Sequence, residues 1–473
     1  MSTTPKHRVI IDTDPGVDDV LALLLALSAS PEDLEVALIS VTYGNVPLHG
    51  CLRNAVALFH VLEKELEWRR ETGRPEGFGA LRAFRPIVAV GAEHPLQEEA
   101  LAADHFHGVD GLHGVHDTHP DLSPADTWRS LFPGAAGAAA DVSAAADADA
   151  DADAEPPSFS SFFTPSRTPA HLEMLRILRE SPAGTVTIVA VGPLTNVALA
   201  AAEDPETLMR AREVVVMGGA VHVPGNITPV AEFNTFADPV AAARVFALTS
   251  ASPASTMPPP PPANTLPAGT EPLAAYPAGL TGRLRLTLFP LDITTPHLLT
   301  RTYFKARMAP LLASGSPLAR WVETVMSRTF VKIDGILRDG SDPGLSLHDP
   351  LTVWYMMTRD DPAWAPAVPG SAEGEDIRIE TGGQWTRGMH VADGRGWSNN
   401  KTVDATATEG GGGGGTEVVT DDPADPLEAV QLDEVPGHVR DWAGAKTPNR
   451  INRIVGSPGE SLFAEFLMKQ LFW

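Results

Sequence analysis

The sequence predicts an α/β fold with a mostly parallel central sheet flanked by helices, and two observations carry this prediction. Short, near-continuous apolar runs rich in β-branched residues recur along the chain, as in strands that are covered on both faces. Segments with helical periodicity follow several of these runs, which is the order expected of βαβ units. In such folds ligands bind at the carboxyl ends of the strands, so the residues that follow the strands are the candidates for function.

The predicted elements alternate along the chain. Strands are predicted at residues 9–12, 35–42, 86–90, 185–191 and 213–217. Helices are predicted at residues 18–29, 48–65, 194–202, 239–248 and 351–357. The first four of these helices each come after a predicted strand, which favours crossover connections between parallel strands.

Four stretches interrupt this pattern, and we expect them to be loop insertions: residues 67–85, 134–169, 250–278 and 369–436. They contain an Ala-Asp alternation, a run of five prolines and a glycine run. Low-complexity sequence of this kind buries too little apolar surface to offset its ordering entropy. The sequence therefore predicts one large domain, residues 1–473, with solvated insertions.

Composition and charge limit the classes of function that the chain can have. The chain has 473 residues, of which 43% are hydrophobic and 20% charged, so it can form a large globular core. Its net charge is −25, and residues 141–155 and 404–434 hold six and nine acidic residues with no basic one. This charge repels phosphate backbones and anionic lipid, so we expect no nucleic-acid or membrane partner. No stretch approaches the roughly 18 apolar residues that a membrane span needs.

The cysteine count and the N-terminal sequence bear on the compartment. Cys51 is the single cysteine, which excludes an intramolecular disulfide and a multi-cysteine zinc site. The first eight residues contain no apolar signal-peptide core. We therefore expect a cytoplasmic protein.

Four carboxylates are concentrated where the first strand meets the first helix, in the sequence DTDPGVDD at residues 12–19. Neighbouring carboxylates raise one another's pKa unless a cation lies between them, and a hard divalent cation bound by oxygen atoms is the simplest arrangement. The structural alternative is that Asp18 caps the helix while Asp12 forms hydrogen bonds within the loop. Four aspartates at one strand-to-helix turn favour the metal site.

Further polar residues follow the other strands. They include Asn45, Asn226, Glu232 and Asn234. Amides and a carboxylate suit the hydroxyl groups of a sugar, whereas a phosphate site would be expected to contain lysine or arginine. Late in the chain, His348 and Asp349 stand together at the start of a helix and would add a titratable group and a fifth carboxylate.

Together these motifs resemble the inosine-uridine-preferring nucleoside N-ribohydrolase family. The DTDPGVDD sequence is similar to the N-terminal signature of that family. The resemblance continues in family order through HGVDGL at 107–112, VGPLTN at 191–196, MGG at 217–219, EFN at 232–234, PLDIT at 290–294, HDP at 348–350 and TRGM at 386–389. It covers most of the chain outside the four insertions.

The resemblance implies a nucleoside hydrolase fold and the hydrolysis of ribonucleosides to ribose and a free base by a calcium-activated water. It implies that Ca²⁺ is held by Asp14, Asp19, Asp349 and the backbone carbonyl of Val191. Asp14 would also take the proton of the water, and His348 would lie near the departing base and protonate it. The ribose would be bound by Asp18, Asn45, Asn226, Glu232 and Asn234. A homodimer or homotetramer follows from family analogy alone.

Two other functions fit parts of the sequence. Phosphatases of the haloacid dehalogenase type also begin with Asp-x-Asp after a first strand, but Gly16 stands where they usually have threonine. A catalytically weak nucleoside-binding or scaffold protein would keep the fold, and the presence of every motif carboxylate argues against it. Base specificity is expected to lie in residues 67–85 and 300–340, but neither segment identifies the base. Trp321, Phe330 and Tyr303 are candidates for stacking on it, although aromatic residues at helical spacing also suit a core.

Overall fold

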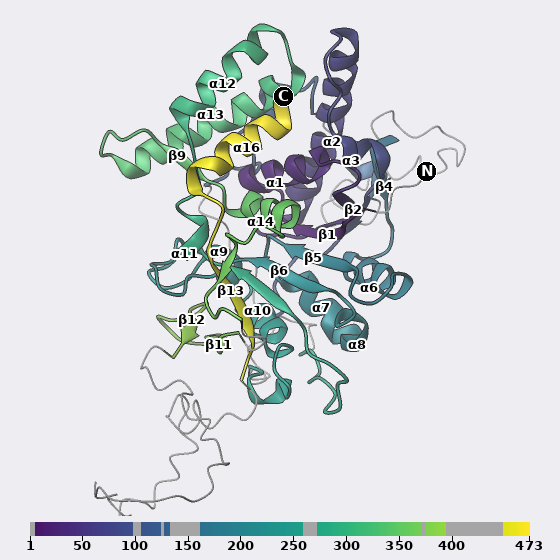
Figure 1. Ribbon diagram of the computed structural model, residues 1–473, viewed down its shortest axis with the longest axis vertical. Helices are drawn as coiled ribbons and strands as arrows, with labels where there is room; N and C mark the ends of the chain where they lie inside the picture. Colours follow the sequence, from purple (N-terminus) through teal and green to yellow (C-terminus); the bar gives the residue numbers. More distant parts are fainter. Residues whose placement is uncertain are drawn as a thin grey trace, which may run out of the picture.

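The computed structural model describes residues 5–97, 106–123, 127–132, 161–258, 272–370, 374–393 and 448–473. Its centre is a nine-stranded sheet in the order β10-β13-β7-β6-β5-β1-β2-β3-β4, with helices on both faces (Figure 1). All neighbouring strands of this sheet are parallel except β10 and β13. The predicted α/β class with a mostly parallel sheet is confirmed.

The strands of the central sheet include all five that the sequence predicts. They are β1 (His7–Thr13), β2 (Leu34–Val41), β3 (Ile87–Val90), β4 (Thr164–Pro165), β5 (Val186–Ala190), β6 (Glu213–Met217), β7 (Leu286–Phe289), β10 (Ala365–Pro366) and β13 (Ile451–Gly456). Two small antiparallel sheets pair β8 (Leu298–Thr300) with β9 (Gly344–Ser346) and β11 (Ile377–Ile379) with β12 (His390–Ala392).

Helices form the two outer layers. They are α1 (Val17–Ser28), α2 (Leu48–Glu71), α3 (Gly79–Ala83), α4 (Val115–Thr118), α5 (Thr127–Leu131), α6 (Ala170–Glu180), α7 (Thr195–Glu203), α8 (Pro205–Leu208), α9 (Phe233–Ala237), α10 (Pro239–Ala247), α11 (Leu291–Thr294), α12 (Arg301–Ala313), α13 (Pro317–Leu337), α14 (His348–Thr358) and α16 (Glu460–Phe472). Within the described ranges, every helix is too short or too polar to cross a bilayer.

Each face of the sheet has its own apolar core. Helices α1, α2, α13, α14 and α16 enclose one core, and α6, α7 and α10 enclose the other. Helix α1 is buried along its whole length because α14, α16 and the sheet surround it. This explains why its sequence is apolar on all sides after the two aspartates of its first turn.

The chain order creates a topological switch point at β1. Strand β1 lies between β2 and β5, since the chain proceeds outward through β2, β3 and β4 and then returns to the opposite side of β1. In register, Asp12 pairs with Ser40 of β2 and Ala190 of β5. The carboxyl ends of these strands therefore meet, which is where open α/β sheets bind ligands.

Residues 67–85, expected to be a loop, are instead largely folded. Helix α2 continues to Glu71, and α3 covers Gly79–Ala83. Phe78 and Leu81 are each 1% exposed in the core beside α2. Two apolar anchors are enough to fix a segment whose composition is otherwise polar.

The other expected insertions are only partly described. Residues 374–393 of the last one form the β11–β12 hairpin, with Ile377 and His390 buried, so this part is not a loop. Residues 272–278 form no helix or strand and are mostly exposed, as expected of a loop, although Arg244 donates to the carbonyls of Leu273 and Ala274. The acidic runs at 141–155 and 404–434 lie outside the described residues, and the single-domain organisation stays a prediction.

Candidate active site

The aspartate turn joins β1 to α1 through buried hydrogen bonds. Asp12 lies inside the sheet, where its Oδ1 accepts from Ser40 Oγ at 2.5 Å and Asn196 Nδ2 at 2.8 Å. Asp19 Oδ1 accepts from Thr13 Oγ1 at 2.6 Å, and its Oδ2 accepts from the backbone N–H of Gly16 at 3.0 Å. Asp19 thus ties the first turn of α1 back to the end of β1.

Asn45, which follows β2, connects the two most deeply placed carboxylates. Its backbone N–H donates to Asp14 Oδ2 at 2.7 Å, and its Nδ2 donates to Asp19 Oδ2 at 2.8 Å. Asp14 and Asp19 are fully buried. Among the residues that the structure describes, none forms a hydrogen bond with Asp14 Oδ1, so one oxygen of a buried carboxylate remains unsatisfied there.

Two glycines allow the backbone to approach Asp14. A Cβ atom on Gly44 would lie 2.0 Å from Asp14 Oδ2, and one on Gly192 would lie 2.5 Å from Asp14 Oδ1. Real side chains do not approach this closely, so both positions require glycine. The structure thus brings the backbone of both glycines against the Asp14 carboxylate.

Three further carboxylates gather beside Asp14. Oxygens of Asp18, Asp19 and Asp349 lie within 4.8 Å of one another and could hold a metal ion. Burial and the neighbouring negative charge raise the pKa of Asp18 to about 8, and the same two causes raise the pKa of Asp14 and Asp349 well above the usual range. A donor set made of oxygen atoms, with one oxygen lacking a partner, fits a hard divalent cation.

A pocket of about 370 Å³ opens beside this cluster. Its lining includes Asp18, Asn45, Val191, Asn226, Glu232, Asn234 and Asp349. Asp14 and Asp19 lie behind Asn45, to which they are hydrogen-bonded. All the residues predicted to bind the sugar therefore line one pocket, and the predicted metal ligands line it or contact its lining.

The loop after β6 supplies Glu232 and Asn234 to the pocket. Glu232 caps α9: its Oε1 accepts from the N–H of Asn234 at 2.7 Å, and its Oε2 accepts from the N–H groups of Gly219 and Thr235. Asn234 Nδ2 donates to the carbonyl oxygen of Val191 at 2.7 Å. These contacts fix both side chains before any ligand binds.

Asn226 and His107 both line the pocket, and each accepts a hydrogen bond from a backbone N–H group. Asn226 Oδ1 accepts from the N–H of Phe233 at 2.9 Å. His107 Nδ1 accepts from the N–H of Val17 at 3.0 Å, which docks residues 106–118 onto the start of α1. Burial lowers the pKa of His107 to about 3, so its ring is neutral.

The pocket also has large apolar side chains in its lining. They are Phe106, Met217, Ile227 and Phe233, together with Ile333, Ile336 and Leu337 of α13 and Leu345 of β9. Ile336 and Leu337, at the end of α13, are 60% and 46% exposed. Large aliphatic side chains left in contact with water at a pocket rim indicate a surface that an apolar part of a ligand covers.

His348 also belongs to the lining of the pocket. It is the first residue of α14 and contacts Thr294 Oγ1 through Nδ1 at 2.7 Å. Burial lowers the pKa of His348 to about 4, so the ring is neutral near pH 7 and carries one proton.

The sequence missed several pocket residues and misjudged others. His107 lay in a family motif without a role, and the apolar wall from α13 carried no recognisable signal. Of the three aromatic candidates for base stacking, Trp321 and Phe330 lie in the core and Tyr303 packs against it. Residues 67–85, expected to influence base choice, contribute nothing to this pocket.

Comparison with known proteins identifies the family of this chain. Residues 9–410 match the family described as "Inosine-uridine preferring nucleoside hydrolase". An uncharacterised protein of Schizosaccharomyces pombe is 30% identical over 387 residues, which are 82% of this chain and 89% of the relative. The pyrimidine-specific ribonucleoside hydrolase RihA of Salmonella enteritidis is 36% identical over 238 residues, which are 50% of this chain and 56% of that relative.

Solved structures with the same fold are also nucleoside hydrolases. A plant nucleoside hydrolase aligns over 99% of both chains with a TM-score of 0.57 and 23% identity. A purine-preferring ribonucleoside hydrolase from Gardnerella vaginalis aligns over 98% of both chains with a TM-score of 0.58 and 18% identity. At these identities the likeness shows the fold alone.

Proposed function

Since the chain belongs to the inosine-uridine preferring nucleoside hydrolase family, whose members hydrolyse N-glycosyl bonds of ribonucleosides, we propose how its own residues carry out this reaction. The observation that carries the proposal is that one pocket is lined by carboxylates and amides and also by large apolar side chains, with His348 in the same lining. The carboxylates and amides suit a ribose, and the apolar side chains suit a base.

The proposed metal is Ca²⁺, held by Asp14, Asp19, Asp349 and the carbonyl oxygen of Val191. The oxygen-only donor set and the buried Asp14 Oδ1 without a partner support this choice, because Ca²⁺ prefers six to eight oxygen ligands. When bound, the ion would orient the attacking water and lower its pKa. Zn²⁺ would be expected to select histidine or cysteine ligands instead.

Asp14 is proposed as the general base that takes the proton of the attacking water. Its Oδ1 is the free oxygen, since Oδ2 is bonded to the N–H of Asn45. The glycines on either side keep this carboxylate in one orientation. General base catalysis of this kind contributes about 10²- to 10⁴-fold in rate.

The ribose is proposed to bind through Asp18, Asn45, Asn226, Glu232 and Asn234. Asn45 and Asn234 use their Nδ2 groups within the protein, which leaves their Oδ1 atoms to accept from sugar hydroxyls. Asn226 uses its Oδ1 and keeps its Nδ2 to donate. The surrounding carboxylates would stabilise the positive charge that develops on the sugar as the glycosidic bond breaks.

His348 is proposed to stabilise the departing base. A neutral imidazole with its proton on the nitrogen remote from Thr294 would donate a hydrogen bond to a ring nitrogen of a purine or to a carbonyl oxygen of uracil as negative charge develops there, and the base would take its proton from water. Relatives that are named for pyrimidine and for purine nucleosides support testing both classes of substrate. A cytoplasmic location and a homodimer or homotetramer are proposed by analogy with the family.

The test is product analysis on the purified protein. We expect it to release uracil from uridine and hypoxanthine from inosine with equimolar reducing sugar, and to contain stoichiometric calcium by elemental analysis. Stoichiometric zinc, or full activity without metal, would contradict the metal assignment. Tight nucleoside binding without product would support the scaffold alternative, and magnesium-dependent release of phosphate from a phosphate ester would support a phosphatase.

A further inference from the structure

Thr294 and His348 come from separate elements and meet beside the pocket. Thr294 ends α11, His348 begins α14, and 54 positions separate them in the chain. Thr294 is fully buried, and its Oγ1 lies 2.7 Å from His348 Nδ1. A threonine hydroxyl can donate or accept, so this distance alone does not say which nitrogen of the neutral ring carries the proton.

The surroundings of Thr294 indicate which group donates in the hydrogen bond between Thr294 and His348. In a helix, a threonine hydroxyl commonly donates to the carbonyl four residues earlier, which here is Pro290. That carbonyl already accepts the backbone N–H groups of Ile293 at 3.0 Å and Thr294 at 3.1 Å. Both lone pairs of the Pro290 oxygen are therefore in use. Among the described residues, the one hydrogen bond of the Thr294 hydroxyl is its contact with His348 Nδ1. A fully buried hydroxyl that only accepted there would leave its own proton unsatisfied, so donation to Nδ1 is favoured.

Helix α11 is held in place, so the Thr294 hydroxyl has a fixed position. The backbone N–H of Leu291 donates to Gly219 O at 2.8 Å, and the Asp292 carboxylate accepts from the N–H groups of Val221 and His222. The N–H of Leu347 donates to His297 O at 2.8 Å, which joins the start of α14 to the end of α11. The contact between Thr294 and His348 is thus supported from both sides.

A neighbouring histidine shows the opposite tautomer. His297 Nδ1 lies 2.8 Å from Ile293 O, which can only accept, so Nδ1 carries the proton. His297 Nε2 then accepts from Ser457 Oγ at 2.8 Å. Two buried histidines near the same helix are therefore assigned different tautomers by their partners, and His297 does not line the pocket.

We propose that Thr294 is a positioning residue that donates a hydrogen bond from its hydroxyl to His348 Nδ1 and so keeps the ring proton on Nε2, from where it donates a hydrogen bond to the departing base. This inference rests on the proposed role of His348 in stabilising the leaving group. Without the Thr294 hydroxyl, the ring can rotate or carry its proton on Nδ1, and the base must leave without that hydrogen bond. The loss should therefore depend on how much stabilisation the leaving group needs.

The experiment compares Thr294→Val, Thr294→Ser and the matched control Ser457→Ala on inosine and on p-nitrophenyl riboside, whose leaving group departs readily unprotonated. We expect Thr294→Val to lower kcat for inosine at least tenfold with KM within about threefold, and to change p-nitrophenyl riboside hydrolysis less than about threefold. Thr294→Ser should recover most of the lost kcat, and Ser457→Ala should behave like the unaltered protein.

A second measurement reads the tautomer directly. In protein labelled with ¹⁵N-histidine, the His348 ring should show its proton on Nε2 in the unaltered protein and in Thr294→Ser, and a shift toward the other tautomer in Thr294→Val. Equal kcat losses on both substrates, or a proton already on Nδ1 in the unaltered protein, would overturn the inference. His348→Ala distinguishes a failure of the proposed role of His348 from a failure of the role of Thr294. If the kcat loss of His348→Ala does not depend on the leaving group, the proposed role of His348 is wrong. If it does depend on the leaving group and that of Thr294→Val does not, only the role of Thr294 is wrong.

Discussion

The aspartate cluster beside the pocket and the Glu65–Arg69 network under α16 are both buried, but they balance their charges differently. Asp14, Asp18 and Asp19 lie together, and among the described residues no ion pair joins them to a lysine or arginine. Glu65 is 1% exposed, and its Oε1 accepts from Arg69 Nε at 2.7 Å. One cluster therefore lacks a cation within the protein, and the other contains its own.

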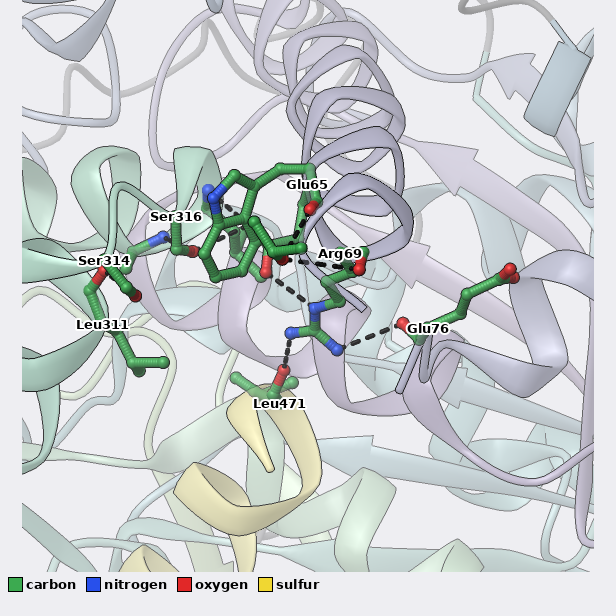
Figure 2. A network of polar contacts seen from close by, with 11 residues as sticks. Glu65, Arg69, Glu76, Leu311, Ser314, Ser316 and Leu471 are labelled. Atoms are coloured by element: carbon green, nitrogen blue, oxygen red, sulfur yellow. Dashed lines mark hydrogen bonds and ion pairs between the residues drawn. The ribbon is translucent and has the colours of Figure 1, made fainter. Parts of the chain in front are cut away.

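The Glu65–Arg69 network also satisfies its remaining polar atoms. Ser316 Oγ and the N–H of Leu318 donate to Glu65 Oε2. The Arg69 guanidinium donates to the carbonyls of Glu76 and Leu471, so it joins α2 to the last turn of α16 (Figure 2). A buried charge that is paired and fully hydrogen-bonded holds elements together.

This difference in charge balance indicates that the aspartate cluster serves function and that the Glu65–Arg69 network serves stability. Burial of an unpaired carboxylate costs free energy, so the folded protein keeps several of them only where an external cation or a reaction uses them. The aspartate cluster should therefore limit activity and weaken the metal-free fold. The Glu65–Arg69 network should determine stability and leave the chemistry alone.

The largest expected effect is on activity, from Asp14→Asn. The amide is nearly isosteric but can neither accept the water proton nor supply a negative ligand, so kcat should fall about 10²- to 10⁴-fold while the protein stays folded. Rates should be measured at saturating Ca²⁺, with circular dichroism as the control for folding. A variant that keeps more than about a tenth of kcat would show that Asp14 is not the base.

The second effect is on stability, from Arg69→Met. This change leaves Glu65 buried without its cation, which typically costs about 3–5 kcal/mol, while kcat/KM of the folded fraction should stay within about twofold. Urea unfolding measures the first quantity. The double variant Glu65→Leu/Arg69→Met should regain part of the loss, because it removes the unpaired charge. A fall in kcat/KM without unfolding would mean that this network supports the pocket after all.

The third prediction concerns the stability of the metal-free protein, which the unpaired carboxylates of the aspartate cluster should lower as the pH rises. Asp18, with an ordinary pKa of 3.8, has a pKa of about 8 in the metal-free fold, so the folded state binds more protons than the unfolded state between these values. The stability of the chelator-treated protein should therefore fall as the pH rises from 4 to 8. Ca²⁺ at 100 times its Kd should restore about 2.7 kcal/mol.

Melting temperatures across this pH range, with and without Ca²⁺, measure the effect. Asp18→Asn is the matched variant, since it removes one of the repelling charges and should flatten the pH dependence of the metal-free protein. A metal-free protein that becomes more stable as the pH rises would contradict the proposed electrostatics of the cluster.

The carboxylate and amide residues of the candidate site could be predicted from the sequence because short local motifs mark them. The DTDPGVDD turn and Asn45 stand at the ends of strands whose apolar runs are easy to recognise, and the parallel sheet brings those ends together. Strand β13 was missed because Asn452 and Arg453 make it look polar. The structure pairs them with Thr287 and Glu375, which a linear sequence does not reveal.

The apolar wall of the pocket could not be predicted for a different reason. Helix α13 has apolar residues at helical spacing along its whole length, and they look alike in sequence whether they enter the core, as Trp321 and Phe330 do, or line the pocket while partly exposed, as Ile336 and Leu337 do. Tertiary packing alone distinguishes them. Likewise, Arg69 looks like a surface residue until α16, about 400 positions later, covers it.

The smallest expected effect comes from Ser316→Ala, which asks whether the two regions communicate through α13. Ser316 caps the start of α13 by accepting from the N–H of Ala319 and also donates to Glu65, whereas the end of the same helix supplies Ile336 and Leu337 to the pocket. Loss of such a cap costs about 1–2 kcal/mol. Because the rest of α13 stays packed against α2, we expect KM for inosine to change less than about twofold.

Urea unfolding and initial rates on the same preparation would test this prediction. Ser314→Ala is the control, because Ser314 is a neighbouring hydroxyl that contacts Leu311 O. A larger rise in KM at unchanged kcat would show that the Glu65–Arg69 network sets the position of the apolar wall.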